Sequence, residues 1–526
     1  MKNSFTQTLY KNRATLCALL IMLCGVLVRV VNFGTTPTGF NQDEAFAGYE
    51  AFSLLHYGVD SWGYHNPCYF VSWGSGMNVL QSYLAIPFIK LLGCSITAVR
   101  LPQLLLACLS LPVFYLLMKN VFSTRAALTG LFLLAISPWH IMLSRWGLES
   151  NLAPAFLLLG LYFFIKGIEN NRYWLASGVM YGLSLYAYSI TWLVVPVTIV
   201  LWVLYLLLSK QKFSFTYLLL FGAILFVFAL PQMLFLLVNK GFISEIVTPF
   251  ISIPKLTVMR GAEISLKNLF SPDTYKNFID VFIRQNDGLP WNATESFGLF
   301  YKISLPFIAL GAITLLKTAW ISAKSKTFCR ETIIILGMLS SIFTCLLLSN
   351  LNVNKANCLH FYTLILLTVG VLEFFALCKG FTCVKITVFC AYLLSFACFV
   401  SFYFNDYDEQ ISYSFNAGLQ PAVSYAKEQT EGDIWVDTLA FYPQILFFDQ
   451  TPTPSFLSTV KYFNYPSAFL VAQEFTRYHF GIDYNNIPPH GTYIIPRNML
   501  PLWEEKGYKT ATFHSFAVAT RAQTQV

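Results

Sequence analysis

Two adjacent carboxylates, Asp43 and Glu44, follow the first hydrophobic segment of the chain. They come after a Pro/Gly loop and before a predicted helix over 45–56, and the stretch 32–78 contains no Lys or Arg to neutralise them. Asp43 could be the N-cap of that helix, because Asp is favoured at this position. A carboxylate pair facing a cavity at a membrane surface could instead supply a general base.

A second polar cluster occupies residues 137–151, at the predicted turn between two hydrophobic segments. It contains His140, Arg145 and Glu149 among several aromatic residues. An arginine in such a turn is either an anchor that reaches toward the headgroups or a clamp for an anion. Both interpretations stay open from the sequence alone.

Two more polar clusters are predicted on the same side of the chain. One surrounds a single lysine with four asparagines, which suits the lining of a phosphate or sugar site better than a membrane anchor. The other contains an Asn-Asp-Gly sequence, which is also ordinary turn chemistry. The candidate binding residues of these two clusters are Asn354, Lys355, Asn357, Asp287 and Asn292.

The composition decides the class of protein that carries these residues. Hydrophobic residues make up 56% of the 526 positions and charged residues only 11%, whereas a soluble chain has about 25% charged residues. Disordered, collagen-like and disulfide-stapled chains are excluded. No basic stripe or zinc spacing indicates a nucleic-acid partner, and no P-loop or HExxH motif is present. The sequence predicts a polytopic α-helical membrane protein.

Hydrophobic runs of about 20 residues, enough to cross a bilayer, recur over the first 404 residues. Basic residues gather in every second connecting loop, and cytoplasmic loops are the ones that carry Lys and Arg. The N-terminus is therefore predicted inside and residues 405–526 outside. The eleven predicted spans lie near 14–31, 98–118, 126–142, 150–168, 173–188, 192–209, 213–238, 301–320, 331–349, 359–378 and 384–404.

This arrangement predicts a transmembrane domain over 1–404, with two long outer loops at 32–97 and 239–300. The short apolar segment 77–93 is interpreted as a helix lying on the outer membrane surface rather than as a span. Residues 405–526 are predicted to form a small extracytoplasmic α/β domain. Its expected elements are a helix over 421–430, strands over 433–437, 492–496 and 513–519, and a loop over 451–466.

The order of these features resembles bacterial membrane glycosyltransferases related to dolichyl-phosphate-mannose protein mannosyltransferases, in the type-C glycosyltransferase superfamily. The similarity runs over essentially the whole length, including the outer tail domain. The residues that carry it are Arg29, Pro37, Gly39, Phe40, Asp43, Glu44, Ala45, Gly58, Asp60, Gly63, Pro67, Tyr83, Pro87, Gly93, Val99, Arg100, Leu101, Pro102, Ser137, Pro138, Trp139, His140, Ser144, Arg145, Asp287, Gly288, Trp291, Asn292, Asn354, Lys355 and Asn357.

The resemblance implies transfer of a sugar from a polyprenyl-phosphate donor to an acceptor on the outer face, with inversion at the anomeric carbon. It implies Asp43 as the general base with Glu44 beside it. Arg145 and Lys355 are candidate cations for the leaving phosphate, although the family commonly has Arg where Lys355 stands. Use of a divalent metal varies across the superfamily, so a metal near Asp43 is a further expectation and no other cofactor is expected.

The expected partners are membrane lipids, the lipid-linked donor, and an acceptor that is a protein, a glycolipid or a wall polymer. The expected location is the plasma membrane, crossed many times, with the active site outside. The competing hypothesis is a transporter or flippase of lipid-linked sugars. Such a protein would show paired half-repeats and several mid-membrane charges, and the sequence shows no half-repeat and the single clear mid-span charge Glu373.

Overall fold

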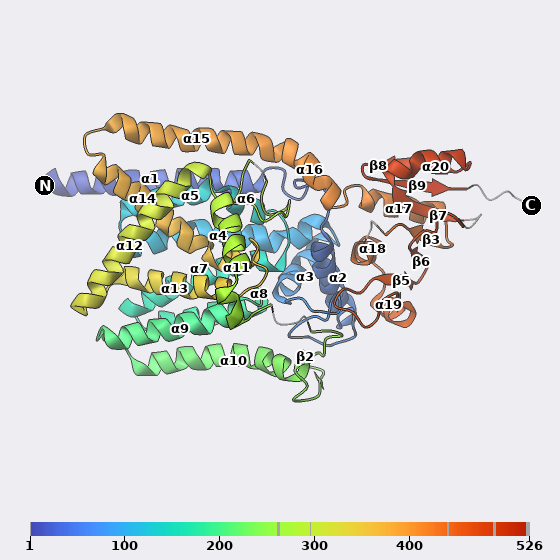
Figure 1. Ribbon diagram of the computed structural model, residues 1–526, viewed down its shortest axis with the longest axis horizontal. Coiled ribbons are helices and arrows are strands. Elements are labelled where there is room, and N and C mark those ends of the chain that lie inside the picture. Colours follow the sequence, from blue (N-terminus) through green and yellow to red (C-terminus); the bar gives the residue numbers. More distant parts are fainter. Residues whose placement is uncertain (1, 260–262, 295, 439–440, 488–490, 522–526) are drawn as a thin grey trace, which may run out of the picture.

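The computed structural model is a bundle of long helices with a smaller mixed α/β domain at one end (Figure 1). In the view of Figure 1, α1 (Lys2–Val30), α9 (Thr191–Leu208), α10 (Phe215–Asn239) and α15 (Thr382–Phe404) run nearly parallel while α12 (Leu305–Ser325) is inclined to them, and the N-terminus lies at the end of the bundle opposite the sheet. The structure describes residues 2–259, 263–294, 296–438, 441–487 and 491–521.

The span predicted at 126–142 is wrong as a single helix, because α5 (Thr124–Ala135) ends at Ala135 and a separate short helix, α6 (Pro138–Leu143), begins at Pro138. Each of the other predicted spans coincides with a helix, because a run of apolar residues satisfies its backbone groups internally only as a helix. In the described part of the chain, eight helices are long and apolar enough to cross a membrane. The multi-helix membrane body is confirmed, and the number of crossings stays a prediction. The helices at the eleven predicted spans, including those too short to count among the eight, are α1 (Lys2–Val30), α4 (Ile96–Val121), α5 (Thr124–Ala135), α7 (Ala153–Glu169), α8 (Tyr173–Ala187), α9 (Thr191–Leu208), α10 (Phe215–Asn239), α12 (Leu305–Ser325), α13 (Arg330–Leu346), α14 (His360–Leu377) and α15 (Thr382–Phe404).

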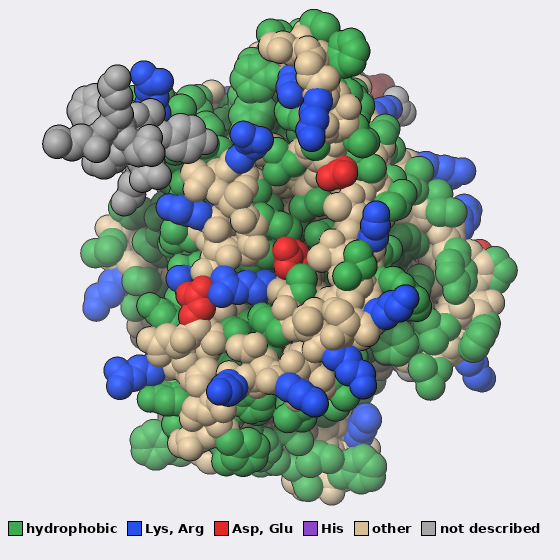
Figure 2. Space-filling view, turned by 90° about the vertical axis from the view of Figure 1, so that its left-hand side faces the viewer, with side chains coloured by type: hydrophobic (Ala, Val, Ile, Leu, Met, Phe, Trp, Pro, Cys, Tyr) green, Lys and Arg blue, Asp and Glu red, His purple; other side chains and the backbone are tan. Residues whose placement is uncertain are grey.

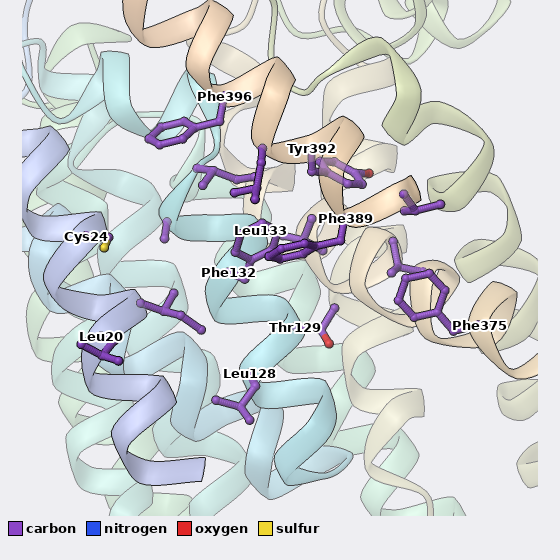
Figure 3. A pocket seen from close by; sticks show the side chains of 16 residues that line it. Leu20, Cys24, Leu128, Thr129, Phe132, Leu133, Phe375, Phe389, Tyr392 and Phe396 are labelled. Carbon is purple, nitrogen blue, oxygen red and sulfur yellow. The ribbon is translucent and has the colours of Figure 1, made fainter. Parts of the chain in front are cut away.

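Small residues allow the closest helix contact, between α12 and α14. A Cβ added at Gly311 would lie 1.9 Å from the Leu366 carbonyl oxygen, and one at Gly370 would lie 1.8 Å from the Phe307 carbonyl oxygen. Each glycine therefore admits the backbone of the other helix, as small residues commonly do between membrane helices. The same bundle contains an apolar recess of about 500 Å³ between α1, α5, α14 and α15 (Figure 3).

The first outer loop contains α2 (Gln42–Tyr57) and α3 (Leu80–Leu92). With 13 residues, α3 is too short to cross a roughly 30 Å hydrocarbon core. Its place on the membrane surface stays a prediction. The second outer loop contains β1 (Ile246–Val247), β2 (Ser252–Ile253), η2 (Leu266–Phe270), α11 (Pro272–Ile279) and η3 (Asp280–Arg284).

The residues after α15 form a seven-stranded mixed sheet in the order β4-β5-β6-β3-β7-β9-β8, flanked by helices. Strand β3 pairs parallel with both β6 and β7, and the remaining pairs are antiparallel. The elements are α16 (Asp406–Ser414), α17 (Leu419–Gln429), β3 (Ile434–Val436), α18 (Tyr442–Asp449), α19 (Thr453–Thr459), β4 (Lys461–Tyr462), β5 (Ala472–Phe475), β6 (Tyr478–Phe480), β7 (Thr492–Pro496), α20 (Leu500–Glu505), β8 (Lys509–Phe513) and β9 (Phe516–Thr520).

Two sequence-based predictions for this domain are wrong. Residues 451–466 were expected to be loop, but they contain α19 and β4, because Pro454 sits in the first turn, where proline is tolerated. Residues 513–519 were expected to be one strand, but the chain turns at His514, which has a φ of +48°. The run is therefore split between β8 and β9, which pair as a hairpin.

The C-terminal domain shares a hydrophobic core with the first outer loop. Phe40 packs against Phe447 at a ring distance of 5.0 Å, and the Tyr49 hydroxyl donates to the Thr451 carbonyl oxygen at 2.9 Å. Gly39 has a φ of +94°, and a Cβ there would meet the Phe415 carbonyl oxygen at 2.4 Å. Only glycine fits this contact, so the loop before α2 is shaped to receive the end of the chain.

The basic residues gather at the end of the bundle opposite the sheet. Figure 2 shows that end, with many Lys and Arg side chains and few Asp or Glu. This distribution supports a cytoplasmic N-terminus under the positive-inside rule, and the orientation stays a prediction.

We expect a reporter enzyme that works only in the cytoplasm to be inactive when fused after Val526. The reason is that the inner loops carry the positive charge, which keeps the sheet domain outside. The measurement is reporter activity in intact cells, with the same reporter inserted between Lys210 and Lys212 as the active control. Strong activity after Val526 would reverse the orientation.

Candidate active site

The N-terminus of α2 is closed by Asn41 rather than by Asp43. The Asn41 side-chain oxygen accepts a hydrogen bond from the Asp43 backbone N–H at 2.8 Å, and the Glu44 carboxylate accepts one from the Asn41 backbone N–H at 3.1 Å. This reciprocal pair is a capping box. The alternative interpretation of Asp43 as an N-cap is therefore wrong, and its carboxylate is not occupied by the cap.

Glu44 is completely buried and forms a two-pronged ion pair with Arg100, which is also completely buried. Arg100 Nε donates to Glu44 Oε1 at 2.8 Å and Nη2 donates to Oε2 at 2.9 Å. The backbone N–H of Gly147 donates to the same carboxylate at 2.5 Å. A carboxylate with this many fixed partners holds the structure together, which separates its role from that of its neighbour.

Arg100 also fixes the loop that leads into α2. Its Nη1 donates to the Pro37 carbonyl oxygen at 2.8 Å and its Nη2 to the Gly39 carbonyl oxygen at 2.9 Å. One guanidinium therefore joins the start of α4 to the entry loop and the first turn of α2. The planar fork of arginine suits such a site, and lysine could not replace it.

Asp43 lies one position earlier and is only partly buried. Its Oδ1 accepts a hydrogen bond from the indole N–H of Trp73 at 3.2 Å. Trp73 is itself held by the C-terminal domain: its carbonyl oxygen accepts from the Leu470 N–H at 2.8 Å, and its ring packs edge-on against Tyr442 at 5.3 Å. The sheet domain therefore sets the position of the group that orients Asp43.

A cleft of about 270 Å³ lies beside this pair, between the first outer loop and the C-terminal domain. Gln42 and Trp73 line one side of it, and aromatic residues of the sheet domain, including Phe441 and Phe469, line the other. The Gln42 side-chain oxygen is buried and has no hydrogen-bond partner among the described residues. An apolar cleft with a few polar groups beside a carboxylate is the usual form of a ligand site.

Arg145 is completely buried and donates to backbone carbonyls at and after the end of α1, with the ring of Tyr403 also beside its guanidinium. A guanidinium has five N–H donors, and each finds a carbonyl oxygen at 2.7–3.3 Å. No N–H of Arg145 is left for a phosphate in this structure. The acceptors are the carbonyl oxygens of Thr36, Val28, Arg29, Val31 and Asn32.

His140 is buried and Glu149 is half-buried. His140 Nδ1 accepts from Arg29 Nη2 at 2.9 Å, and its ring stacks on His360 at 5.5 Å. The Glu149 carboxylate accepts a hydrogen bond from the Asn78 backbone N–H. The second polar cluster thus contacts α1 and the first outer loop.

The third and fourth clusters meet each other. Asp287 Oδ2 accepts from the Asn292 side chain at 2.8 Å and from the Val353 backbone N–H at 2.9 Å. Asp287 also lines a polar cavity of about 730 Å³ together with residues of both clusters. The other lining residues are Asn277, Asp280, Val281, Arg284, Asn286, Gly288, Leu289, Asn350, Leu351 and Asn352.

The remaining residues of the asparagine cluster do not share one partner. Lys355 pairs with Glu263 of the second outer loop at 2.7 Å. Asn357 donates to the Ser150 carbonyl oxygen at 3.1 Å and so joins the second and third clusters. The buried side-chain oxygen of Asn354 has no partner among the described residues. Arg145 and Lys355, the two candidate cations for the leaving phosphate, thus contact different partners, and their role toward a donor stays a prediction.

The described residues near Asp43 do not fit a metal ion. No group of three or more His, Cys, Asp or Glu side chains that could hold one is found in the described part of the chain. Both Glu44 oxygens are already engaged by Arg100. A metal near Asp43 stays an untested expectation, and no step of the mechanism below uses one.

Sequence reasoning missed a second pair of carboxyl groups, Glu50 and Asp60, both completely buried in the first outer loop. Glu50 accepts from the backbone N–H of Ser61 at 2.8 Å, and Asp60 Oδ1 accepts from two backbone N–H groups. Burial raises the pKa of Asp60 to about 7, and burial with the nearby Asp60 carboxyl holds the pKa of Glu50 well above its usual range. The only sequence signal was the Gly58-x-Asp60-x-x-Gly63 motif.

Comparison with known proteins supports the resemblance inferred from the sequence. Residues 79–235 match the profile of the family described as dolichyl-phosphate-mannose-protein mannosyltransferase. The match begins after Asp43 and Glu44 and covers less than a third of the chain. No curated protein sequence matches the chain.

Solved structures share the fold at low sequence identity. ArnT from Cupriavidus metallidurans, bound to undecaprenyl phosphate, is 11% identical with a TM-score of 0.56, over 96% of this chain and 98% of that one. The oligosaccharyltransferase AglB from Archaeoglobus fulgidus, in complex with an inhibitory peptide and a dolichol-phosphate, is 13% identical with a TM-score of 0.50, over 98% of this chain and 75% of that one. The predicted likeness in fold to these membrane proteins is therefore confirmed.

We expect Arg145→Gln to destabilise the fold by about 3 kcal/mol or more, because several buried carbonyl oxygens lose their donors. The measurements are the yield of monodisperse protein after detergent extraction and its thermal midpoint. The control is Arg284→Gln, which removes an exposed ion pair with Asp280. A normal thermal midpoint combined with weaker use of the donor would instead indicate that Arg145 binds the donor phosphate.

We expect Asp60→Asn to weaken the pH dependence of stability. The folded pKa of Asp60, about 7, lies above the unfolded value near 3.9, so the folded state binds more protons and loses stability as pH rises between these values. The effect is roughly 1.4 kcal/mol for each pKa unit. Thermal midpoints at pH 5 and pH 8 test this: wild type should fall more than Asp60→Asn. Equal falls would place the ionised form of Asp60 in the native state at pH 5.

Proposed function

We propose that the protein is an inverting glycosyltransferase that moves a sugar from a polyprenyl-phosphate donor to an acceptor on the outer face of the plasma membrane. The observation that carries this proposal is the contrast between Asp43 and Glu44. The Asp43 carboxylate accepts a hydrogen bond from an indole N–H beside a cleft, whereas the Glu44 carboxylate forms an ion pair with a buried arginine. The match of residues 79–235 to a mannosyltransferase family supports a glycosyltransferase.

In the proposed reaction, Asp43 takes the proton from the acceptor hydroxyl. The acceptor oxygen attacks the anomeric carbon while the bond from that carbon to the phosphate oxygen breaks, and the polyprenyl phosphate leaves with the electron pair. One displacement of this kind inverts the anomeric carbon. The donor already contains the activated bond, so no nucleotide is needed. Trp73 keeps the carboxylate of Asp43 aimed, since an indole N–H donates in one direction only.

The developing charge on the leaving phosphate needs a cation. Arg145 is occupied by backbone carbonyls, so Lys355 is the remaining candidate from the sequence. Its pairing with Glu263 ties it to the second outer loop, and Asn354 beside it has an unpartnered oxygen. We infer that donor binding replaces the Glu263 contact by a contact with phosphate, which the amides of this cluster support.

The lipid part of the donor needs an apolar surface within the bilayer. The recess between α1 and α15 is lined almost entirely by apolar side chains, with Leu20 and Cys24 on one side and Phe389, Tyr392 and Phe396 on the other (Figure 3). A volume of about 500 Å³ suits several isoprene units. The structures of ArnT and AglB named above contain undecaprenyl phosphate and dolichol-phosphate respectively, which is in keeping with a donor of this class.

We expect Asp43→Asn to reduce sugar transfer at least about a hundredfold, the usual contribution of a positioned general base, while leaving the yield and the thermal midpoint unchanged. The Trp73 hydrogen bond survives because Asn keeps one acceptor oxygen. The measurement is turnover of polyprenyl-phosphate sugars by purified protein.

Glu44→Gln is the matched control on the neighbouring position. It should lower the yield of folded protein, because Arg100 is left buried without a charged partner. Near-normal transfer by Asp43→Asn would remove Asp43 from catalysis, and Glu149 or Asp287 would become the next carboxylate to test.

A further inference from the structure

The second outer loop exposes an unusual number of large apolar side chains. In the hairpin that follows α10, Phe242 is 72% and Phe250 is 85% exposed, and in η2 Phe270 is 86% exposed. A water-facing loop rarely shows apolar groups this large together. Eight of these exposed side chains, here called the loop surface, are Phe242, Val247, Phe250, Leu266, Phe270, Tyr275, Ile279 and Ile283.

The opposite side of the same loop is buried against the rest of the protein, with Ile253, Leu256 and Val281 in hydrophobic clusters, and it is attached by backbone hydrogen bonds. The hairpin joins the first outer loop, where the Cys68 N–H donates to the Ser252 carbonyl oxygen at 3.0 Å. The segment before α11 joins the end of α13, where the Ser265 N–H donates to the Leu347 carbonyl oxygen at 3.0 Å. The loop is therefore a fixed wall with one face toward the candidate site and one apolar face outward.

The helical part of the loop has the pattern of a helix that lies in a membrane surface. Tyr275, Ile279 and Ile283 recur every four residues on the exposed side, while Thr274 and Val281 are buried on the other side. In Figure 1, α11 lies across the long helices instead of along them. A helix with one large apolar face and this direction is typical of the membrane interface.

The position of the hairpin gives the identity of its partner. It starts at Lys240, directly after α10, which is itself long and apolar enough to cross a membrane. The loop surface is thus continuous with the lipid-facing surface of the bundle. The exposed Lys240, Lys255, Lys267 and Lys276 border it, as lysines do when their stems lie along apolar surface and their ammonium groups reach the headgroups.

We propose that the second outer loop is immersed in the outer leaflet, with the loop surface among the lipid chains, and that it fixes the depth of the first outer loop. Ser252 of the hairpin forms backbone hydrogen bonds with Asn66 and Cys68 of the first outer loop. Glu245 of the second loop accepts a hydrogen bond from the Tyr64 hydroxyl at 2.8 Å. The lipid contact does not depend on the proposed function. Its consequence, that Asp43 is held at the level of a lipid-linked phosphate, rests on that function.

Photocrosslinking tests the lipid contact directly. The full chain with p-benzoylphenylalanine in place of Phe250 or Phe270 is reconstituted in nanodiscs of phosphatidylethanolamine and phosphatidylglycerol, irradiated, and analysed by mass spectrometry. We expect phospholipid adducts at both positions. The matched control is the same substitution at Phe463, which is 56% exposed on the C-terminal domain and should give no adduct.

Three outcomes would overturn the proposal: no lipid adduct at 250 and 270, equal adducts at 463, or crosslinks to a second copy of the chain in place of lipid. The photoreactive residue is a phenylalanine analogue at an exposed position, so folding is preserved and a missing adduct is informative.

The consequence for catalysis is tested with Phe250→Glu and Phe270→Glu together, compared with Phe463→Glu. Loss of one buried phenylalanine is worth about a tenfold change in an equilibrium. Because the variant loses two phenylalanines, we expect turnover of a full-length polyprenyl donor to fall about a hundredfold relative to turnover of a donor with two isoprene units. An unchanged ratio would contradict the depth-setting role. Absence of turnover with both donors in the wild type would reject the proposed function and leave the crosslinking result to decide the lipid contact.

Discussion

The buried ion pair between Glu44 and Arg100 is the interaction on which the outer part of this structure depends. Both groups are removed from water, which costs several kcal/mol for each ion unless geometry and further hydrogen bonds compensate. Here further hydrogen bonds do compensate. Arg100 also donates to two carbonyl oxygens of the entry loop, and Glu44 also accepts from the backbone N–H groups of the N-cap residue and Gly147. Three segments distant in sequence meet at this one pair: the stretch 37–44, the start of α4 and the turn at Gly147.

This constraint explains how neighbouring carboxylates acquire different roles. Adjacent residues of a helix point in directions about 100° apart, so a helix held by Glu44 must turn Asp43 away from the interior. Asp43 then meets Trp73, whose backbone is bound by the sheet domain through Leu470. The C-terminal domain is therefore part of the candidate site, and the core shared with α2 is the means by which it takes part.

The sequence predicted the membrane body because a long apolar run can do little else in a bilayer than form a helix. It also identified Asp43 and Glu44, since an acidic pair in a loop without basic residues is a local pattern. It did not predict that Arg145 donates to the carbonyl oxygens at the end of α1, or that Arg100 forms an ion pair with Glu44. These pairings join residues 56 and more than 100 positions apart, and spacing carries no information about them.

The sheet domain was harder to predict for a related reason. Its central strand β3 is parallel to β6 and β7, which follow it at a distance, and three strands of two to four residues complete one edge. Short strands owe their conformation to their partners and not to their own propensity. The local pattern was therefore sufficient for β7, which has five residues and is buried, and insufficient for β4, β5 and β6.

The outer loops reach the site from different sides and are joined to each other. Backbone bonds link the hairpin of the second loop to Cys68 in the first, and the rest of the second loop is bound to the end of α13 beside the asparagine cluster. The carboxylate of Asp43 and the ammonium of Lys355 are thus attached to one connected wall. If that wall moved deeper into or out of the bilayer, both groups would move together. The distance between the two groups would then stay the same, whereas their distance from a substrate anchored in the lipid would change.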